Sequence, residues 1–234
     1  MSRARHAVAW ASGAAGVAAG AYAAWAGSAW LRYGHVAPPS PAAADPLLDH
    51  FMPVYEVVER HHIRVGAPAD VTYAAAKEMD LTRSRIVRAI FRTRELLLGA
   101  EPEHAARPSG IVALTQSLGW GVLAEHPGRE LVMGAVTQPW MANVVFRALP
   151  PDTFAGFEEP GFVKIAWTLR ADPLDATRSV FRTETRVIAT SADARVKFRR
   201  YWAWLSPGII IIRRLSLRPL KAEAERRGRV AAQS

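Results

Sequence analysis

The alternation of hydrophobic and polar positions is clearest over residues 163–170 and again over residues 181–187. A period of two is typical of a strand with one buried face, so these segments predict the two strands of a β-hairpin. The intervening loop, residues 171–178, is expected to turn near Asp175. The odd-numbered residues of both strands then share one face of the sheet.

That shared face predicts the lining of a ligand cavity. A turn centred on Asp175 places Trp167 opposite Thr183 and Leu169 opposite Phe181. Threonines within an aromatic surface suit a pocket that offers a few hydroxyls, but β propensity at a sheet rim explains them equally well. The residues expected to line the cavity are Trp120, Ile165, Trp167, Leu169, Phe181, Thr183, Thr185, Trp202 and Leu205.

A helical period replaces the alternation after the last strand, and it predicts a long C-terminal helix. Ser191 or Asp193 is expected to cap the start of this helix, and Pro207 with Gly208 to kink or break it. The curved sheet is the large apolar surface available, so the helix is expected to fold back onto it, with a cavity between the two. The stripe expected to be buried consists of Phe198, Trp202, Leu205, Ile209 and Ile212.

Earlier segments complete an α+β order of elements. Residues 55–65 predict a strand, and a short helix follows to about Met79. Residues 80–100 predict a second helix because their apolar positions form a helical stripe. Two further strands are expected on either side of the turn at residues 126–129.

The N-terminal part of the chain is predicted to lie outside the folded domain. The apolar segment 1–33 has no charge from Ala7 to Leu31, a stretch that spans about 37 Å as a helix, against about 30 Å of hydrocarbon in a bilayer. We predict a single membrane anchor; the alternatives are a cleaved signal peptide, giving a secreted protein, and an alanine-rich soluble helix. Residues 34–50, rich in proline and alanine, predict an extended linker before a folded domain over 51–228.

The net charge of +9 is concentrated at the C-terminal end. From Arg195 to Ser234 there are eleven lysines and arginines against Glu223 and Glu225, which leaves nine positive charges. A solvated helix surface explains such a tail, and attraction of the basic helices to an anionic membrane is the alternative. We expect no nucleic-acid partner, because no recognised binding motif is present.

Motifs for catalysis or metal binding are sparse. The chain has no cysteine, and its histidines lack the spacing of metal ligands, so neither a metal nor a cofactor is expected. His61 and His62 point to opposite faces of their strand. An inward-facing His61, or Glu59, is the candidate general acid or base, although a hydrogen-bonded core histidine is the commoner case. An exposed charge ladder is expected from Arg182, Glu184 and Arg186.

Several stretches resemble the START-related helix-grip superfamily, also called SRPBCC. They are "IRVGAPADVTYAA", "MDLTRSRIVRAIFRTREL", "FRTETRVIATSADARVKFRRYW" and "SPGIIIIRRLSL". This group includes polyketide cyclases and dehydrases, lipid-transfer domains and plant allergens. The resemblance covers about residues 53–225. It implies an α+β helix-grip fold, in which a curved antiparallel sheet wraps around a long C-terminal helix and encloses a hydrophobic cavity. It implies no reaction, because the superfamily shares no catalytic residues.

These observations together predict a protein that binds a hydrophobic small molecule or lipid, as a membrane-tethered carrier or sensor. The alternative is a polyketide cyclase- or dehydratase-like enzyme that uses an acid or base in the cavity; that hypothesis rests on family analogy. A third hypothesis is a module that docks on membranes through its basic helices.

Overall fold

An antiparallel six-stranded sheet forms the centre of the computed structural model, which describes residues 2–80, 89, 92, 99 and 108–233. The strands pair in the order β1-β6-β5-β3-β2, and β4 pairs with β3. Their bounds are β1 (Val57–Val65), β2 (Gly121–His126), β3 (Glu130–Thr137), β4 (Phe146–Arg147), β5 (Val163–Pro173) and β6 (Ser179–Ala189).

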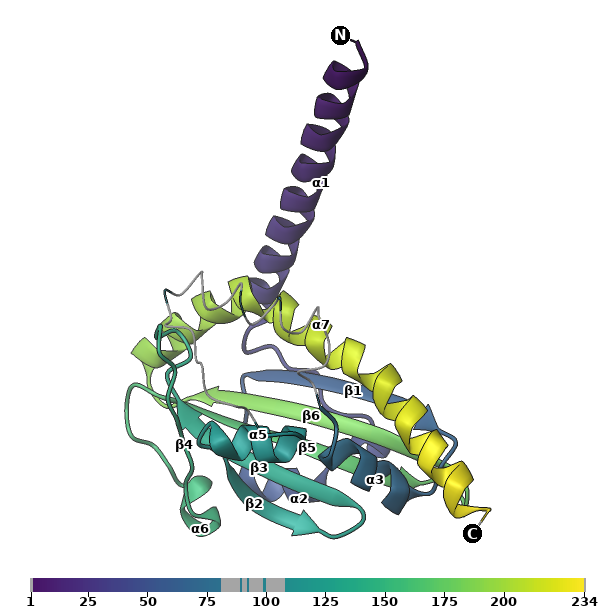
Figure 1. The fold of residues 1–234 in the computed structure, drawn as a ribbon. Coiled ribbons are helices and arrows are strands. Elements are labelled where there is room, and N and C mark those ends of the chain that lie inside the picture. Colours follow the sequence, from purple (N-terminus) through teal and green to yellow (C-terminus); the bar gives the residue numbers. More distant parts are fainter. Residues whose placement is uncertain (1, 81–88, 90–91, 93–98, 100–107, 234) are drawn as a thin grey trace.

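Helices cover both faces of the sheet (Figure 1). The long helix α7 (Ala192–Ala231) crosses one face, where α3 (Ala69–Lys77) and α5 (Ile111–Ser117) also pack. The shorter helices α2 (Pro46–Phe51) and α6 (Pro151–Phe154) pack on the other face, and η1 (Pro41–Ala43) precedes α2. A curved antiparallel sheet with a long C-terminal helix is the helix-grip fold, so the predicted fold class is confirmed. The helix predicted over residues 80–100 lies largely outside the described residues.

β5 and β6 form the predicted hairpin in a different register. Trp167 lies opposite Thr185 rather than Thr183, and Phe181 lies opposite Ala171, because the turn is one residue further along the chain than predicted. A turn displaced by one residue moves each pair by two positions. An even shift keeps every side chain on its predicted face, so the odd-numbered residues still face α7.

The predicted C-terminal helix is present as α7 and begins at its predicted cap. The hydroxyl of Ser191 accepts a hydrogen bond from the backbone N–H of Ala194 at 3.3 Å. The helix continues through Pro207, so the predicted break is wrong. Trp202 and Ile210 are buried on either side of this proline, and their packing offsets the lost backbone hydrogen bond.

The buried stripe of α7 differs from the predicted one after Trp202. Ser206 and Ile210 are buried, whereas Leu205 and Ile209 are only partly buried. The stripe is thus displaced by one residue in the middle of the helix. This displacement decides which side chains of the following turns point at the sheet.

The outer face of the sheet, opposite α7, is covered by a segment expected to be a linker. α2 begins at Pro46, and its Leu48, together with Met52 at its C-terminal cap, is buried against even-numbered residues of β3 and β5. Arg186 and Glu184, which point to this face, are therefore buried rather than exposed. The predicted surface charge ladder is wrong for these two residues, because alternation identifies a face without showing what packs on it.

Helix α1 (Ser2–Arg32) projects away from the sheet, and the C-terminal end of α1 contacts α7 (Figure 1). There the indole N–H of Trp25 donates to the hydroxyl of Ser206 at 3.3 Å, and Arg199 donates to the carbonyl oxygen of Trp30. Across the described parts of the chain, none of the helices is both long enough and apolar enough to cross a membrane. The predicted transmembrane helix is therefore not supported.

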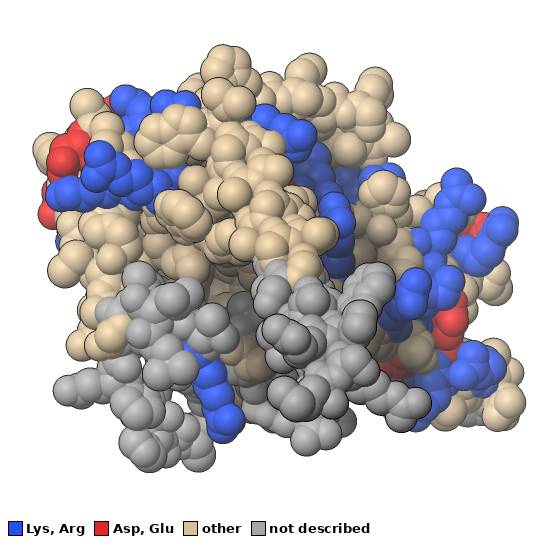
Figure 2. Space-filling view, turned by 90° about the horizontal axis from the view of Figure 1, so that it is seen from above, with Lys and Arg blue, Asp and Glu red and all other residues tan. Residues whose placement is uncertain are grey.

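The basic C-terminal end of the chain belongs to α7. Seen from above, lysine and arginine side chains occur along this helix, on the face from which α1 projects (Figure 2). Some of these charges are neutralised within the helix, since Arg226 and Arg227 both pair with Glu223 at 2.7 Å. Arg214 and Arg218 are exposed. Contact of this surface with a membrane stays a prediction.

Candidate functional site

Two apolar cores lie between the inner face of the sheet and the helices packed on it. In the first, the α3-side core, Trp167 and Phe181 pack with residues of α3 and with Leu220 of α7. In the second, the α1-side core, Val187 and Trp202 are buried near the C-terminal end of α1. β1, β5, β6 and α7 each contribute to both cores, so the stretch of each element between the two cores faces the same space.

An inner polar cluster occupies that stretch. It consists of Glu59 and His61 of β1, Thr183 and Thr185 of β6, and Arg213 of α7. Glu59 lies opposite Thr185 and His61 lies opposite Thr183 in the β1–β6 ladder, with all four on the odd-numbered face. Arg213 Nη1 donates a hydrogen bond to Thr183 Oγ1 at 3.2 Å. The apolar packing between sheet and helix is therefore interrupted at one level by five polar side chains.

Two atoms of this cluster are buried and lack a hydrogen-bond partner among the described residues, namely His61 Nε2 and Thr185 Oγ1. The side chain of His61 is 8% exposed, and its Nε2 lies 3.5 Å from Glu59 Oε2. A buried polar atom without a partner costs about 1–3 kcal/mol. Atoms of this kind mark a position where a bound molecule or a water completes the hydrogen bonding.

Arg213 brings a positive charge to the cluster from α7, on the side opposite the sheet. Burial lowers the pKa of Arg213 to about 10, while the carboxylate of Glu59 acts in the opposite direction. The guanidinium therefore stays charged at neutral pH. A guanidinium has five N–H donors, so most of them remain for other acceptors after the hydrogen bond to Thr183.

Sequence reasoning missed Arg213, although a signal for it was present. This arginine was counted only among the basic residues of the C-terminal end. The buried positions of α7 include Ser206, Ile210, Leu220 and Ala224. Steps of three and four from Ile210 lead through position 213 to Leu220, which places Arg213 on the stripe that faces the sheet.

The other predicted cavity residues lie on the inner face but are divided between the two cores. Leu169 belongs to the α3-side core, and Trp120 packs against it with its ring centroid 6.3 Å from that of Trp167. Ile165 packs against the α1-side core. Leu205 is partly buried on α7. The face was thus predicted correctly, while a ligand-binding role for these side chains stays a prediction.

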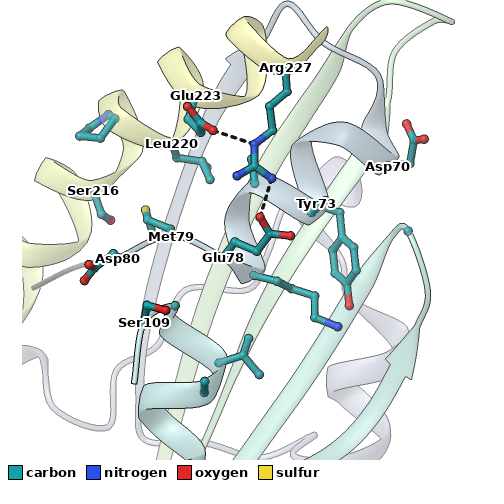
Figure 3. A pocket seen from close by; sticks show the side chains of 18 of the residues that line it. Asp70, Tyr73, Glu78, Met79, Asp80, Ser109, Ser216, Leu220, Glu223 and Arg227 are labelled. Atoms are coloured by element: carbon teal, nitrogen blue, oxygen red, sulfur yellow. Dashed lines mark hydrogen bonds and ion pairs between the residues drawn. The ribbon is translucent and has the colours of Figure 1, made fainter. Parts of the chain in front are cut away.

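A large pocket of about 1280 Å³ lies between α3, α5, α7 and the β2–β3 turn (Figure 3). Met79 and Leu220 contribute to its wall and also to the α3-side core. Arg227 donates to Glu78 and to Glu223, both at 2.7 Å, so this guanidinium at the rim is already bound to two carboxylates. None of the predicted cavity residues lines this pocket.

On another side of the same pocket, the carboxylate of Glu125 is bound by two neighbouring side chains. Tyr73 donates to Glu125 Oε1 at 2.7 Å, and Lys77 approaches the same oxygen at 2.5 Å. These two hydrogen bonds hold the pKa of Glu125 below its ordinary value. Both cations that line the large pocket, Lys77 and Arg227, are therefore bound to carboxylates of the chain itself.

A smaller pocket of about 240 Å³ connects with the inner polar cluster. It lies beneath the C-terminal end of α1, and Glu59, Trp202 and Ile210 are among the residues that line it. Glu59 thus belongs both to this pocket and to the polar cluster. Within the described residues, no group of three or more histidine or acidic side chains is arranged to hold a metal ion.

No protein-family model matches the chain, and no curated protein matches it. Among solved structures, it is similar to norcoclaurine synthase from Thalictrum flavum, with 10% identity, a TM-score of 0.34 and coverage of 71% of this chain and 94% of the synthase. It is also similar to an aromatase/cyclase from a Streptomyces species, with 15% identity, a TM-score of 0.23 and coverage of 73% and 94%.

The resemblance to the START-related helix-grip superfamily is a resemblance of fold. The antiparallel sheet with α7 packed across its inner face has the helix-grip architecture that this resemblance implies. At TM-scores of 0.34 and below, these alignments carry no argument about a ligand or a reaction.

Proposed function

We propose that the chain binds a small, largely apolar molecule with a polar group, in the space between the sheet and α7. The observation that carries this proposal is the inner polar cluster, in which His61 Nε2 and Thr185 Oγ1 are buried without a partner among the described residues. The polar group of the ligand would complete their hydrogen bonding, and the neighbouring cores would contact its apolar body. A protein that only binds such a molecule, without converting it, would act as a carrier or sensor.

Native mass spectrometry of the full chain tests the proposal. We expect the native mass to exceed the denatured mass by one apolar compound, and extraction into organic solvent to identify it. Thr185→Phe places a ring among the polar atoms of the cluster, so this variant is expected to lose the compound.

Thr177→Phe is the matched control, because it makes the same substitution in the exposed β5–β6 turn. This variant is expected to keep the compound, and both variants should unfold near the wild-type temperature. Equal retention by the two variants would place the ligand elsewhere. A wild-type protein that carries no compound and takes up no apolar probe would contradict the proposed function.

A second function is favoured by one observation, the closeness of His61 and Glu59. The two side chains share the inner face, and 3.5 Å separates Nε2 from the carboxylate oxygen. An unpartnered imidazole nitrogen beside a carboxylate can accept or donate a proton at a bound substrate, as a general acid or base does. This arrangement suits the predicted cyclisation or dehydration of a polyketide-like molecule.

His61→Gln distinguishes the enzyme from the carrier. Glutamine keeps a hydrogen-bonding side chain but does not exchange protons near neutral pH. If His61 is an acid or base in a dehydration, the compound extracted from the variant is expected to be heavier than the wild-type compound by one water molecule. If the chain is a carrier, wild type and variant release the same compound.

A further inference from the structure

We infer that the bound molecule ends in a carboxylate and that Arg213 binds this group. This inference rests on the proposed function and adds the chemical class of the ligand to it. Three features carry it: the unused donors of Arg213, the distribution of charge around it, and the apolar surroundings of the inner polar cluster.

The first feature is the hydrogen bonding of the guanidinium. Among the described residues, Arg213 makes one hydrogen bond, from Nη1 to the neutral hydroxyl of Thr183. A planar guanidinium offers parallel N–H groups, and a carboxylate accepts two of them at once. A hydroxyl or ester oxygen carries no charge and lacks the paired oxygens of a carboxylate, so its hydrogen bonds to the guanidinium are weaker.

The second feature is charge. Glu59 is the acidic side chain whose charge acts on Arg213, but its carboxylate also lies 3.5 Å from His61 Nε2 and borders the small pocket. The hydrogen bond of Arg213 goes to Thr183 and not to Glu59. The guanidinium therefore lacks a directly bound anion among the described residues, although its partial burial makes such a partner valuable.

The third feature is the composition of the surroundings. The two cores on either side of the cluster are apolar and include Trp167, Phe181 and Trp202. A small inorganic anion has no apolar part that could lie beside these cores. An amphiphilic acid, with an apolar body and one carboxylate, contacts both the cores and Arg213.

Parinaric acid and its methyl ester form a matched pair of fluorescent probes for this inference. They share one apolar chain and differ in whether the end carries a charge. We expect the full-length protein to bind the acid at least about tenfold more tightly than the ester, because a hydrogen bond to a charged group contributes about 1.5–3 kcal/mol.

Arg213→Met is expected to abolish this preference by weakening binding of the acid about tenfold or more, with little change for the ester. Arg214→Met is the matched control, since this arginine is the next residue along the helix and is exposed. It removes the same overall charge and should keep the preference. Loss of preference in both variants would show a long-range effect of net charge and would overturn the inference.

Glu59→Gln is a variant that is expected to strengthen, rather than weaken, binding of the acid. Removing this carboxylate eliminates its repulsion of a bound acid, so the variant is expected to bind the acid several-fold more tightly, with the ester unchanged. Equal binding of acid and ester by the wild type would overturn the inference and leave the proposed function intact. Binding of neither probe, together with an empty native mass, would contradict both.

Discussion

Replacing Arg186 with methionine is expected to lower the free energy of unfolding by about 3–5 kcal/mol. This side chain is fully buried beneath α2. Its Nε donates to Glu184 at 2.7 Å, and its Nη1 donates to Asp49 at 2.5 Å and to the carbonyl oxygen of Met52 at 2.8 Å. Methionine fills much of the volume but leaves the buried Glu184 with Arg60 as its remaining charged partner.

The matched control is Arg182→Met, in the same strand and on the same face. Arg182 is about one-fifth exposed and pairs with Asp172 at 2.9 Å, so its loss is expected to cost about 1 kcal/mol or less. Urea-induced unfolding followed by circular dichroism measures both changes. Equal losses for the two variants, or a loss below about 1 kcal/mol for Arg186→Met, would show that the buried network does not hold α2 on the sheet.

This network also shows where sequence reasoning stopped. Alternation along residues 181–187 correctly separated an inner from an outer face, because a strand has a period of two. Alternation carries no information about what covers a face. The covering element, α2, begins only at Pro46 and is six residues long, so its few apolar positions show no helical period. The arginines above it were therefore expected to be exposed.

The inner face was predictable to a greater extent. The two threonines were assigned to the inner face from parity, and His61 or Glu59 was a candidate if it pointed inward; the structure places all four on that face. The register was wrong by two residues, but an even error does not move a side chain to the other face. The face on which a strand residue lies is thus predicted more reliably than the residue opposite it. A candidate site defined by faces is therefore unchanged when the turn is misplaced by one residue.

The contribution of α7 was less predictable for a physical reason. The stripe of a helix is fixed by which residues its neighbours bury, and Ser206, a small polar residue, takes the place expected for Leu205. Local hydrophobicity favours the leucine, whereas the close approach of Trp25 from α1 selects the serine. Because that contact joins residues 181 positions apart, no local pattern reports it, and the inward position of Arg213 was overlooked with it.

Replacing Glu130 with glutamine is expected to change the dependence of stability on pH. Glu130 lies at the start of β3 on the outer face and is 5% exposed. Its Oε1 has no hydrogen-bond partner among the described residues. Burial and the nearby carboxylate of Asp45 raise the pKa of Glu130 to about 8, although Arg170 opposes them.

The sign of the effect follows from proton binding. Between about pH 4.5, the ordinary value, and pH 8, Glu130 is protonated in the folded chain and ionised in the unfolded chain. The folded state then binds more protons, so its contribution to stability is complete below about pH 4.5 and is lost as the pH rises to 8. A shift of this size corresponds to several kcal/mol, because one pKa unit is about 1.4 kcal/mol.

Glutamine imitates the protonated acid at every pH, so Glu130→Gln should match the wild type near pH 5 and exceed its stability by about 2–4 kcal/mol at pH 8. Urea unfolding of both proteins at pH 5, 6.5 and 8 measures the difference, in which contributions common to the two proteins cancel. Glu125→Gln on the neighbouring strand is the control. Lys77 and Tyr73 lower the pKa of Glu125, so its contribution is already complete at pH 5 and the variant should be less stable by a constant amount. Parallel curves for wild type and Glu130→Gln would show that Glu130 is ionised in the folded chain.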